Sequence, residues 1–146
     1  MLNRKRFIQQ AAMSAGAMLA GPSIMESASY FNPLKITILH TNDTHSRLEP
    51  FPMDGSRNQG LGGIASRGKL ISKIRNEEEN VLLLDAGDIF QGTPYFNIYK
   101  GEPEIKAMTS LGYDATTIGN HDFDAGMESL ATQLTRHANF PMLVCN

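Results

Sequence analysis

Strand-like and helix-like segments alternate along the chain, and this alternation restricts its fold more than any other feature. The clearest strand is Val81–Asp85, because the run VLLLD is continuously apolar, as is typical of a strand covered on both faces of a sheet. Helical spacing is clearest in Met127, Leu130 and Leu134. The predicted strands are residues 34–39, 81–85, 113–119 and 141–145, and the predicted helices are residues 63–78, 103–112 and 126–138. This order predicts a layered α/β fold.

The first 30 residues have the features of an export signal. A basic start, MLNRKR, is followed by the apolar stretch AAMSAGAMLA and then by small residues near Ser27 and Ser29. The apolar run, about 14 residues, is shorter than the ~20 that cross a bilayer, so we expect no stable membrane span after signal removal. Arg4-Lys5-Arg6 resembles the twin-arginine pattern, with Lys in place of the second Arg. Residues 1–30 therefore predict export to the periplasm or the extracellular space, with the twin-arginine route as one candidate.

The net charge argues against a nucleic-acid polymer as a partner, and the cysteine content excludes an internal disulfide. The formal net charge is −2 and no basic face stands out, so we expect no nucleic-acid polymer as a partner. A small-molecule phosphate ester or nucleotide would instead need local cations, and metal ions supply these most economically. The single cysteine, Cys145, excludes an internal disulfide.

Polar residues of ligand type follow three of the predicted strands. Asp43 and His45 follow the first, Asp88 the second and Asn120 the third. In α/β sheets, ligands bind beyond the carboxyl ends of the strands, where these segments meet. Asp43 and His45 are two residues apart, so an extended backbone would point both side chains the same way. Carboxylate, imidazole and amide oxygen together suit a divalent cation such as Zn, Mn or Fe.

Two glycines precede the predicted ligands of the second and third segments. Gly87 comes directly before Asp88, and Gly119 comes directly before Asn120. Without a Cβ, each glycine allows another stretch of backbone to approach closely. For Asp43 taken alone, a turn stabilised by its own side chain is an equally simple explanation. The repetition at three strand ends favours the metal site.

The strings DTH, GD and GNHDFD, which contain these residues, resemble the first motifs of the calcineurin-like metallophosphoesterases. The longer strings LHTNDTH, GDIFQGTPYFN and GYDATTIGNHDFDAG resemble the 5′-nucleotidase branch more narrowly. The resemblance covers residues 34–146. It implies that these residues are the N-terminal part of a catalytic domain, the front half of a layered metallophosphatase-type sandwich.

The same resemblance implies a pair of divalent metal ions. Asp43 and His45 would bind the first ion, Asp88 would bridge the two, and Asn120 would offer its side-chain oxygen to the second. The implied enzyme hydrolyses phosphate esters, in particular nucleoside 5′-monophosphates or related nucleotides, by a water molecule that the metals activate.

The resemblance also assigns a catalytic pair. His121 would lie beside the phosphate as an electrophile or proton donor, and Asp124 would hold the orientation of its ring, as the carboxylate does in a Ser-His-Asp triad. Asp124 also stands where the N-cap of the next helix would lie. Asp122 is interpreted as a hydrogen-bonded loop carboxylate. His40 falls on the same side of its strand as the preceding isoleucines, which favours a hydrogen-bonded core histidine over a ligand.

The sequence departs from the family pattern after His121. The pattern requires a lone histidine and a Gly-His-x-His run, whereas His137 is the only later histidine here. The base-stacking C-terminal domain of the nucleotidases is also not seen. We therefore expect a truncated enzyme whose residues 1–146 alone bind metal weakly and hydrolyse little. Alternatives are a non-catalytic module with at most one metal, or a cyclic-nucleotide phosphodiesterase or sugar-nucleotide hydrolase on the same scaffold.

Overall fold

Strands and helices alternate in the computed structural model, which describes residues 33–145. The elements are β1 (Thr37–Thr41), α3 (Ile64–Glu77), β2 (Val81–Asp85), α4 (Pro94–Tyr99), α5 (Glu102–Leu111), β3 (Ala115–Thr116), the 3-10 turn η2 (His121–Phe123) and α6 (Met127–His137). All of them belong to a compact unit that begins at Ile36. The predicted export segment, residues 1–30, lies outside the described residues. Within residues 33–145, no helix combines the length and apolar character needed to cross a membrane.

The three strands form one parallel sheet in the order β1-β2-β3. Thr41 pairs with Asp85, and Asp85 pairs in turn with Thr116, so the strands are in register at their carboxyl ends. Parallel neighbours require crossover connections, which α3 provides between β1 and β2 and α5 between β2 and β3. The segments that carry the predicted ligands therefore leave the sheet at one common edge.

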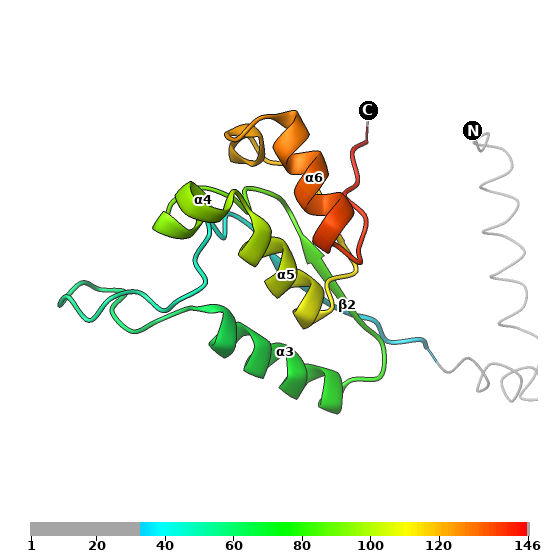
Figure 1. Cartoon of the computed structure of the whole chain (residues 1–146). Coiled ribbons are helices and arrows are strands. Elements are labelled where there is room, and N and C mark those ends of the chain that lie inside the picture. The colour runs from blue at the N-terminus through cyan, green and yellow to red at the C-terminus, as the bar shows by residue number, and fades with distance from the viewer. Residues whose placement is uncertain (1–32, 146) are drawn as a thin grey trace, which may run out of the picture. The chain divides into compact units, whose positions relative to one another are not determined.

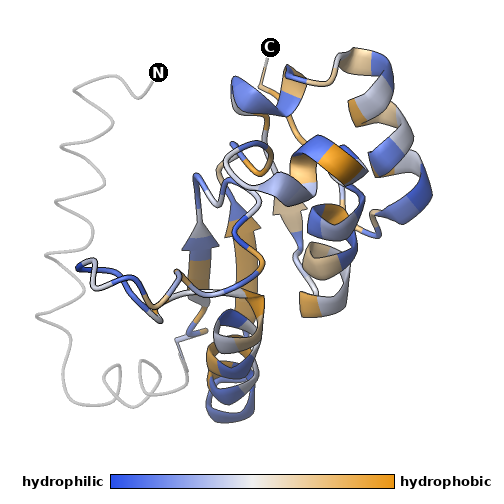
Figure 2. Cartoon of the chain, turned by 60° about the vertical axis from the view of Figure 1, so that its left-hand side comes forward, coloured by the Kyte–Doolittle hydropathy of each residue, from blue (hydrophilic) through white to orange (hydrophobic). Residues whose placement is uncertain are grey.

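The hydrophobic core lies between one face of the sheet and the helices. Helix α5 packs between α3 and α6 (Figure 1). The side chain of Leu83 in β2 is 1% exposed and that of Ile105 in α5 is fully buried. Figure 2 shows hydrophobic and hydrophilic residues alternating along the helices, as expected for elements that bury one side. The buried core residues are Ile71, Leu83, Ile89, Phe90, Phe96, Ile105, Met108, Tyr113, Leu130 and Phe140.

The opposite face of the sheet is open within the described residues. Ile36 and Ile38 are 57% and 61% exposed, and Leu82 of β2 is 37% exposed. His40 is exposed as well, so the prediction of a core histidine is wrong here. The strand pattern places these side chains on one side correctly, but no element of residues 33–145 covers that side. For the same reason, β2 is not covered on both faces.

Two predicted strands are shorter than the sequence suggests. The segment 113–119 contributes only Ala115–Thr116 to the sheet, and the segment 141–145 forms no strand. A single bridge joins Thr116 to Met142. The segment before α5 lies outside the predicted helices and strands, but it contains α4, which begins at Pro94, a residue suited to the first helical turn. The remaining helices, α3, α5 and α6, lie within a residue or so of their predicted bounds.

Candidate metal centre

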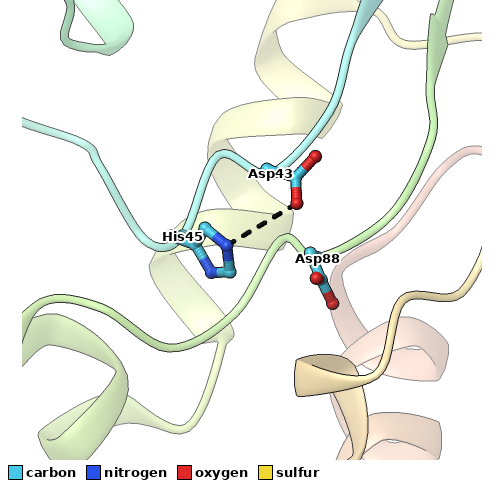
Figure 3. A group of neighbouring side chains, drawn as sticks. All are labelled: Asp43, His45 and Asp88. Atoms are coloured by element: carbon cyan, nitrogen blue, oxygen red, sulfur yellow. Dashed lines mark ion pairs between the residues drawn. The ribbon is translucent and has the colours of Figure 1, made fainter.

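Three ligand-type side chains converge at the carboxyl edge of the sheet. One side-chain atom from each of Asp43, His45 and Asp88 lies within 4.8 Å of the others (Figure 3). His45 Nε2 lies 3.8 Å from Asp43 Oδ1, and the two side chains are 36% and 56% exposed. The group is therefore open to solvent, so that a small ion and a substrate have access to it.

The backbone turns sharply at each of these three residues. The φ angles are 50° at Asp43, 44° at His45 and 54° at Asp88, all in the left-handed region that residues other than glycine rarely occupy. The prediction that an extended backbone aligns Asp43 with His45 is therefore wrong, although both side chains reach the same place. Strand β1 ends at Thr41, so the alternation of its side chains no longer applies. Backbone in such conformations is concentrated at functional sites.

Backbone hydrogen bonds hold the two ligand-bearing segments together. Asp43 N–H donates to the carbonyl of Gly87 (3.0 Å), and His45 N–H donates to the carbonyl of Asp88 (3.1 Å). These bonds continue the pairing of β1 with β2 beyond the ends of both strands. As a result, the relative positions of the ligands depend on the sheet and not on flexible loops.

The ring of His45 is oriented for binding through Nε2. Its Nδ1 lies 3.1 Å from the carbonyl oxygen of Phe90. Because a carbonyl only accepts, Nδ1 must carry the hydrogen in this bond, and the neutral ring then has its lone pair on Nε2. A backbone carbonyl commonly fixes the tautomer of a metal-binding histidine in this way.

Asp88 is held by close backbone contacts and by a neighbouring N–H group. The backbone of Gly87 approaches Gly119 so closely that a Cβ on Gly87 would lie 2.5 Å from the Gly119 nitrogen. Gly119 in turn contacts Asp88. His121 N–H donates to Asp88 Oδ1 at 2.9 Å. The prediction that these glycines permit close approach is confirmed.

Asp122 organises the turn that carries Asp88. Its side chain is 1% exposed. Oδ1 accepts hydrogen bonds from the N–H groups of Ile89 (2.9 Å) and Phe90 (3.1 Å). Oδ2 accepts from the N–H groups of Asp88 (3.1 Å) and Gly119 (2.9 Å). Asp122 is thus the hydrogen-bonded loop carboxylate that the sequence predicts. Its link to the segment of Asp88 could not be read from the sequence, because three of its four donors lie more than 30 residues away.

His121 and Asp124 form the predicted pair. His121 Nδ1 lies 2.9 Å from Asp124 Oδ2. This hydrogen bond raises the pKa of His121 above its ordinary value and lowers the pKa of Asp124 below its own. Gln91 donates a second hydrogen bond to Asp124 Oδ2 at 3.2 Å. The N-cap of α6 is Gly126, so the alternative role of Asp124 as that cap is wrong.

His121 and Asn120 lie at the same rim as the three converging ligands. The rings of His45 and His121 are 5.4 Å apart between centroids, in an edge-to-face arrangement. Asn120 stands between Gly119 and His121, both of which contact Asp88. Its side chain is exposed, and no hydrogen bond of its amide is found within residues 33–145. The segments that carry the other five predicted site residues therefore meet at Asp88.

The donor set at this rim fits a divalent cation. It offers two carboxylates and one imidazole nitrogen. Neither Asp43 nor Asp88 forms an ion pair with a lysine or arginine in the described part of the chain. Within residues 33–145, no lysine or arginine therefore neutralises their negative charge. Such mixed oxygen and nitrogen sites suit Zn, Mn and Fe.

A parallel α/β sheet with two carboxylates and an imidazole gathered at its carboxyl edge places this chain among the α/β proteins with a candidate metal site at the strand ends. The chain belongs to the calcineurin-like phosphoesterase family, whose profile matches residues 36–144.

Several 5′-nucleotidases are similar to this chain. The 5′-nucleotidase of Bos taurus is 48% identical over 118 residues, which is 78% of this chain and 21% of that protein. A snake venom 5′-nucleotidase from Gloydius brevicauda is 48% identical over 115 residues, which is 77% of this chain and 20% of that protein. The chain thus spans about a fifth of the length of the curated relatives it matches.

Solved structures show the same likeness. The crystal structure of a 5′-nucleotidase precursor from Thermus thermophilus superimposes with a TM-score of 0.69 at 42% identity, over 76% of this chain and 22% of that one. An NAD nucleotidase from Haemophilus influenzae superimposes with a TM-score of 0.68 at 35% identity, over 77% of this chain and 21% of that one.

Proposed function

We propose that this chain carries part of the active site of a metal-dependent phosphoesterase that hydrolyses nucleoside 5′-monophosphates or related nucleotides. The observation that carries the proposal is the convergence of Asp43, His45 and Asp88 within 4.8 Å, beside the paired side chains of His121 and Asp124. The names of the relatives support the substrate class, since several are 5′-nucleotidases and one is an NAD nucleotidase.

Two divalent cations, Zn, Mn or Fe, would be held at this rim. Asp43 and His45 are assigned to the first cation, Asp88 to both, and Asn120 to the second. The exposure of these side chains and the absence of competing ion pairs among the described residues support the assignment. Bound there, the cations would neutralise charge on the phosphate oxygens and lower the pKa of a water molecule that serves as nucleophile.

His121 is assigned the transfer of a proton to the leaving oxygen of the ester. Its Nδ1 is engaged by Asp124, so Nε2 is the ring atom that is left to meet the substrate. The raised pKa of His121 keeps the ring protonated to higher pH, which suits a proton donor. Asp124 positions the ring and stabilises its charge, and Gln91 holds Asp124 in turn.

Export of the protein is part of the same proposal. Residues 1–30 are assigned as the signal that directs it to the periplasm or the extracellular space, with the twin-arginine route as the candidate. The names of the relatives support export, because one is a venom protein and another is described as a precursor.

Replacement of Asp88 tests the proposed function. In the full-length protein, Asp88→Asn should lower both the bound metal, measured by elemental analysis, and the hydrolysis of a nucleoside 5′-monophosphate, by ~10²-fold or more. Asp54→Asn is the matched control, because Asp54 is an exposed carboxylate in a turn that accepts from Ser56 N–H. An Asp88→Asn protein with full metal content and full turnover would refute the proposal.

A further inference from the structure

A pocket of about 620 Å³ adjoins the candidate metal centre. Its wall includes Asp43 and His45 together with Phe51, Arg47 and Arg67. Two proposed metal ligands and two arginines therefore line one cavity. A phosphate held at the metal centre would have further positive charge next to it.

Neither arginine is neutralised within residues 33–145. No carboxylate pairs with Arg47 or Arg67 among the described residues. The guanidinium carbon of Arg47 lies 4.4 Å from the centre of the Phe51 ring. Contact with an aromatic face orients the planar group and leaves its N–H donors free. Both arginines are partly buried, so solvent screens their charge less than at an open surface.

The start of α3 adds to this positive charge. Gly63, which lines the pocket, is the N-cap of α3, and the first turn contains no acidic residue. Arg67 stands in that first turn. The partial positive charge of the helix N-terminus therefore reinforces the two arginines, which carry the argument.

We propose that this pocket binds a second phosphate of the substrate. The enzyme would then bind nucleoside diphosphates and other polyphosphorylated nucleotides more tightly than monophosphates. The inference rests on the proposed function for the place of the first phosphate at the metal centre. The cations there would neutralise the charge of the first phosphate. Arg47 and Arg67 would then be available to bind a second anion. Arginine binds phosphate through two parallel hydrogen bonds, and the pocket volume accommodates such a group.

Kinetics on two substrates test the pocket in the full-length protein. We expect Arg47→Gln and Arg67→Gln each to raise the ratio of KM for a nucleoside 5′-diphosphate to KM for the 5′-monophosphate by about tenfold, as for loss of one charge-assisted hydrogen bond. Lys69→Gln is the matched control, because Lys69 is exposed on the same helix and outside the pocket. It should leave the ratio unchanged. An unchanged ratio in both arginine variants would overturn the proposal.

Calorimetry gives a readout that does not depend on turnover. The protein should bind a methylene-bridged nucleoside diphosphate more tightly than the corresponding monophosphate, and Arg67→Gln should abolish most of this difference. If Arg67→Gln instead weakens only the binding of inorganic phosphate, the pocket holds a free ion and the proposal is refuted. If the unaltered protein hydrolyses no nucleotide, the proposed function fails, and the calorimetric comparison still decides the role of the pocket.

Discussion

Gly119 lies so close to Asp88 that a Cβ on Gly119 would stand 2.1 Å from Asp88 Oδ1 and 2.3 Å from the Asp88 nitrogen. The carboxylate is fixed by His121 N–H, and the nitrogen by Asp122, so neither atom is free to move aside. The absence of a side chain at position 119 is therefore a condition for the position of a proposed metal ligand.

Gly119→Ala should accordingly displace Asp88 in the full-length protein. We expect loss of bound metal and a fall in kcat of ~10²-fold or more, as for misplacement of a reacting group by about 1 Å. Elemental analysis and steady-state kinetics measure the two effects. Gly55→Ala is the control, because no atom lies within 4 Å of its Cβ position and only its φ of 81° adds strain. Normal metal content and kcat in Gly119→Ala would contradict this account.

Asp122→Asn should damage the fold and the metal centre together. Asparagine keeps one acceptor oxygen where aspartate has two, so about two of the four backbone N–H groups would lose their partner. Each buried unpaired N–H costs about 1–3 kcal/mol, which predicts a loss of ~2 kcal/mol or more in the free energy of unfolding. Metal affinity should fall as well, because Asp88 lies in the turn that Asp122 holds.

Asp114→Asn is the control for Asp122→Asn, both for stability and for metal affinity. The Asp114 carboxylate accepts from one backbone N–H, that of Leu83, and its residue is exposed. Chemical denaturation should show a smaller loss of stability in this variant, and metal titration should show unchanged affinity. Equal behaviour of the two variants would refute a positioning role for Asp122.

The order of elements could be predicted from the sequence because it depends on local patterns. Val81–Asp85 and α6 match their predicted bounds closely, since one is a continuous apolar run and the other has helical spacing with a glycine before it. The segment 141–145 has an equally apolar sequence, yet it forms only a bridge at Met142. A strand requires a hydrogen-bonded neighbour, and the sequence does not show how far that neighbour extends.

The sequence predicts that candidate ligands meet at one edge of the sheet, but it does not predict their geometry. Parallel strands bring their carboxyl ends together, so the positions of Asp43, Asp88 and Asn120 after three strands predict one rim. The left-handed backbone at Asp43 and His45 was not predictable, because it arises from pairing with the segment after β2. The three donors to Asp122 from residues 88–90 could not be predicted either, because they also come from the segment after β2.

His121→Asn should separate catalysis from metal binding. The side chain lies beside the proposed ligands without being one of them, so we expect unchanged metal content and a fall in kcat of ~10²-fold or more if it donates a proton. Asp124→Asn should lower kcat less, because the ring remains but loses the hydrogen bond that orients it. His137→Asn, at the end of α6, is the control. Full activity in His121→Asn would exclude the assigned role.

The buried carboxyl group of Glu104 should make stability depend on pH. Its residue is 3% exposed, and neither side-chain oxygen has a hydrogen-bond partner among the described residues. Burial raises the pKa of Glu104 above 4.5, and the nearby Ser46 hydroxyl offsets part of this. A raised pKa in the folded state means that folding favours the protonated form. The stabilisation that comes from protonated Glu104 is therefore complete at pH values below the pKa of the group in the unfolded chain. It is lost as the pH rises through the higher pKa of the group in the folded state.

Glu104→Gln should remove this dependence, because glutamine has nearly the same shape and no charge. At pH 8 the variant should exceed the unaltered protein in the free energy of unfolding by about 1 kcal/mol or more, and the advantage should shrink at pH 5, where Glu104 is more protonated. Urea denaturation at the two pH values measures the difference. Glu79→Gln, a substitution at an exposed position after α3, should show no such gain. If Glu104→Gln lowers stability equally at both pH values, the carboxyl group is not a buried unpaired charge at neutral pH.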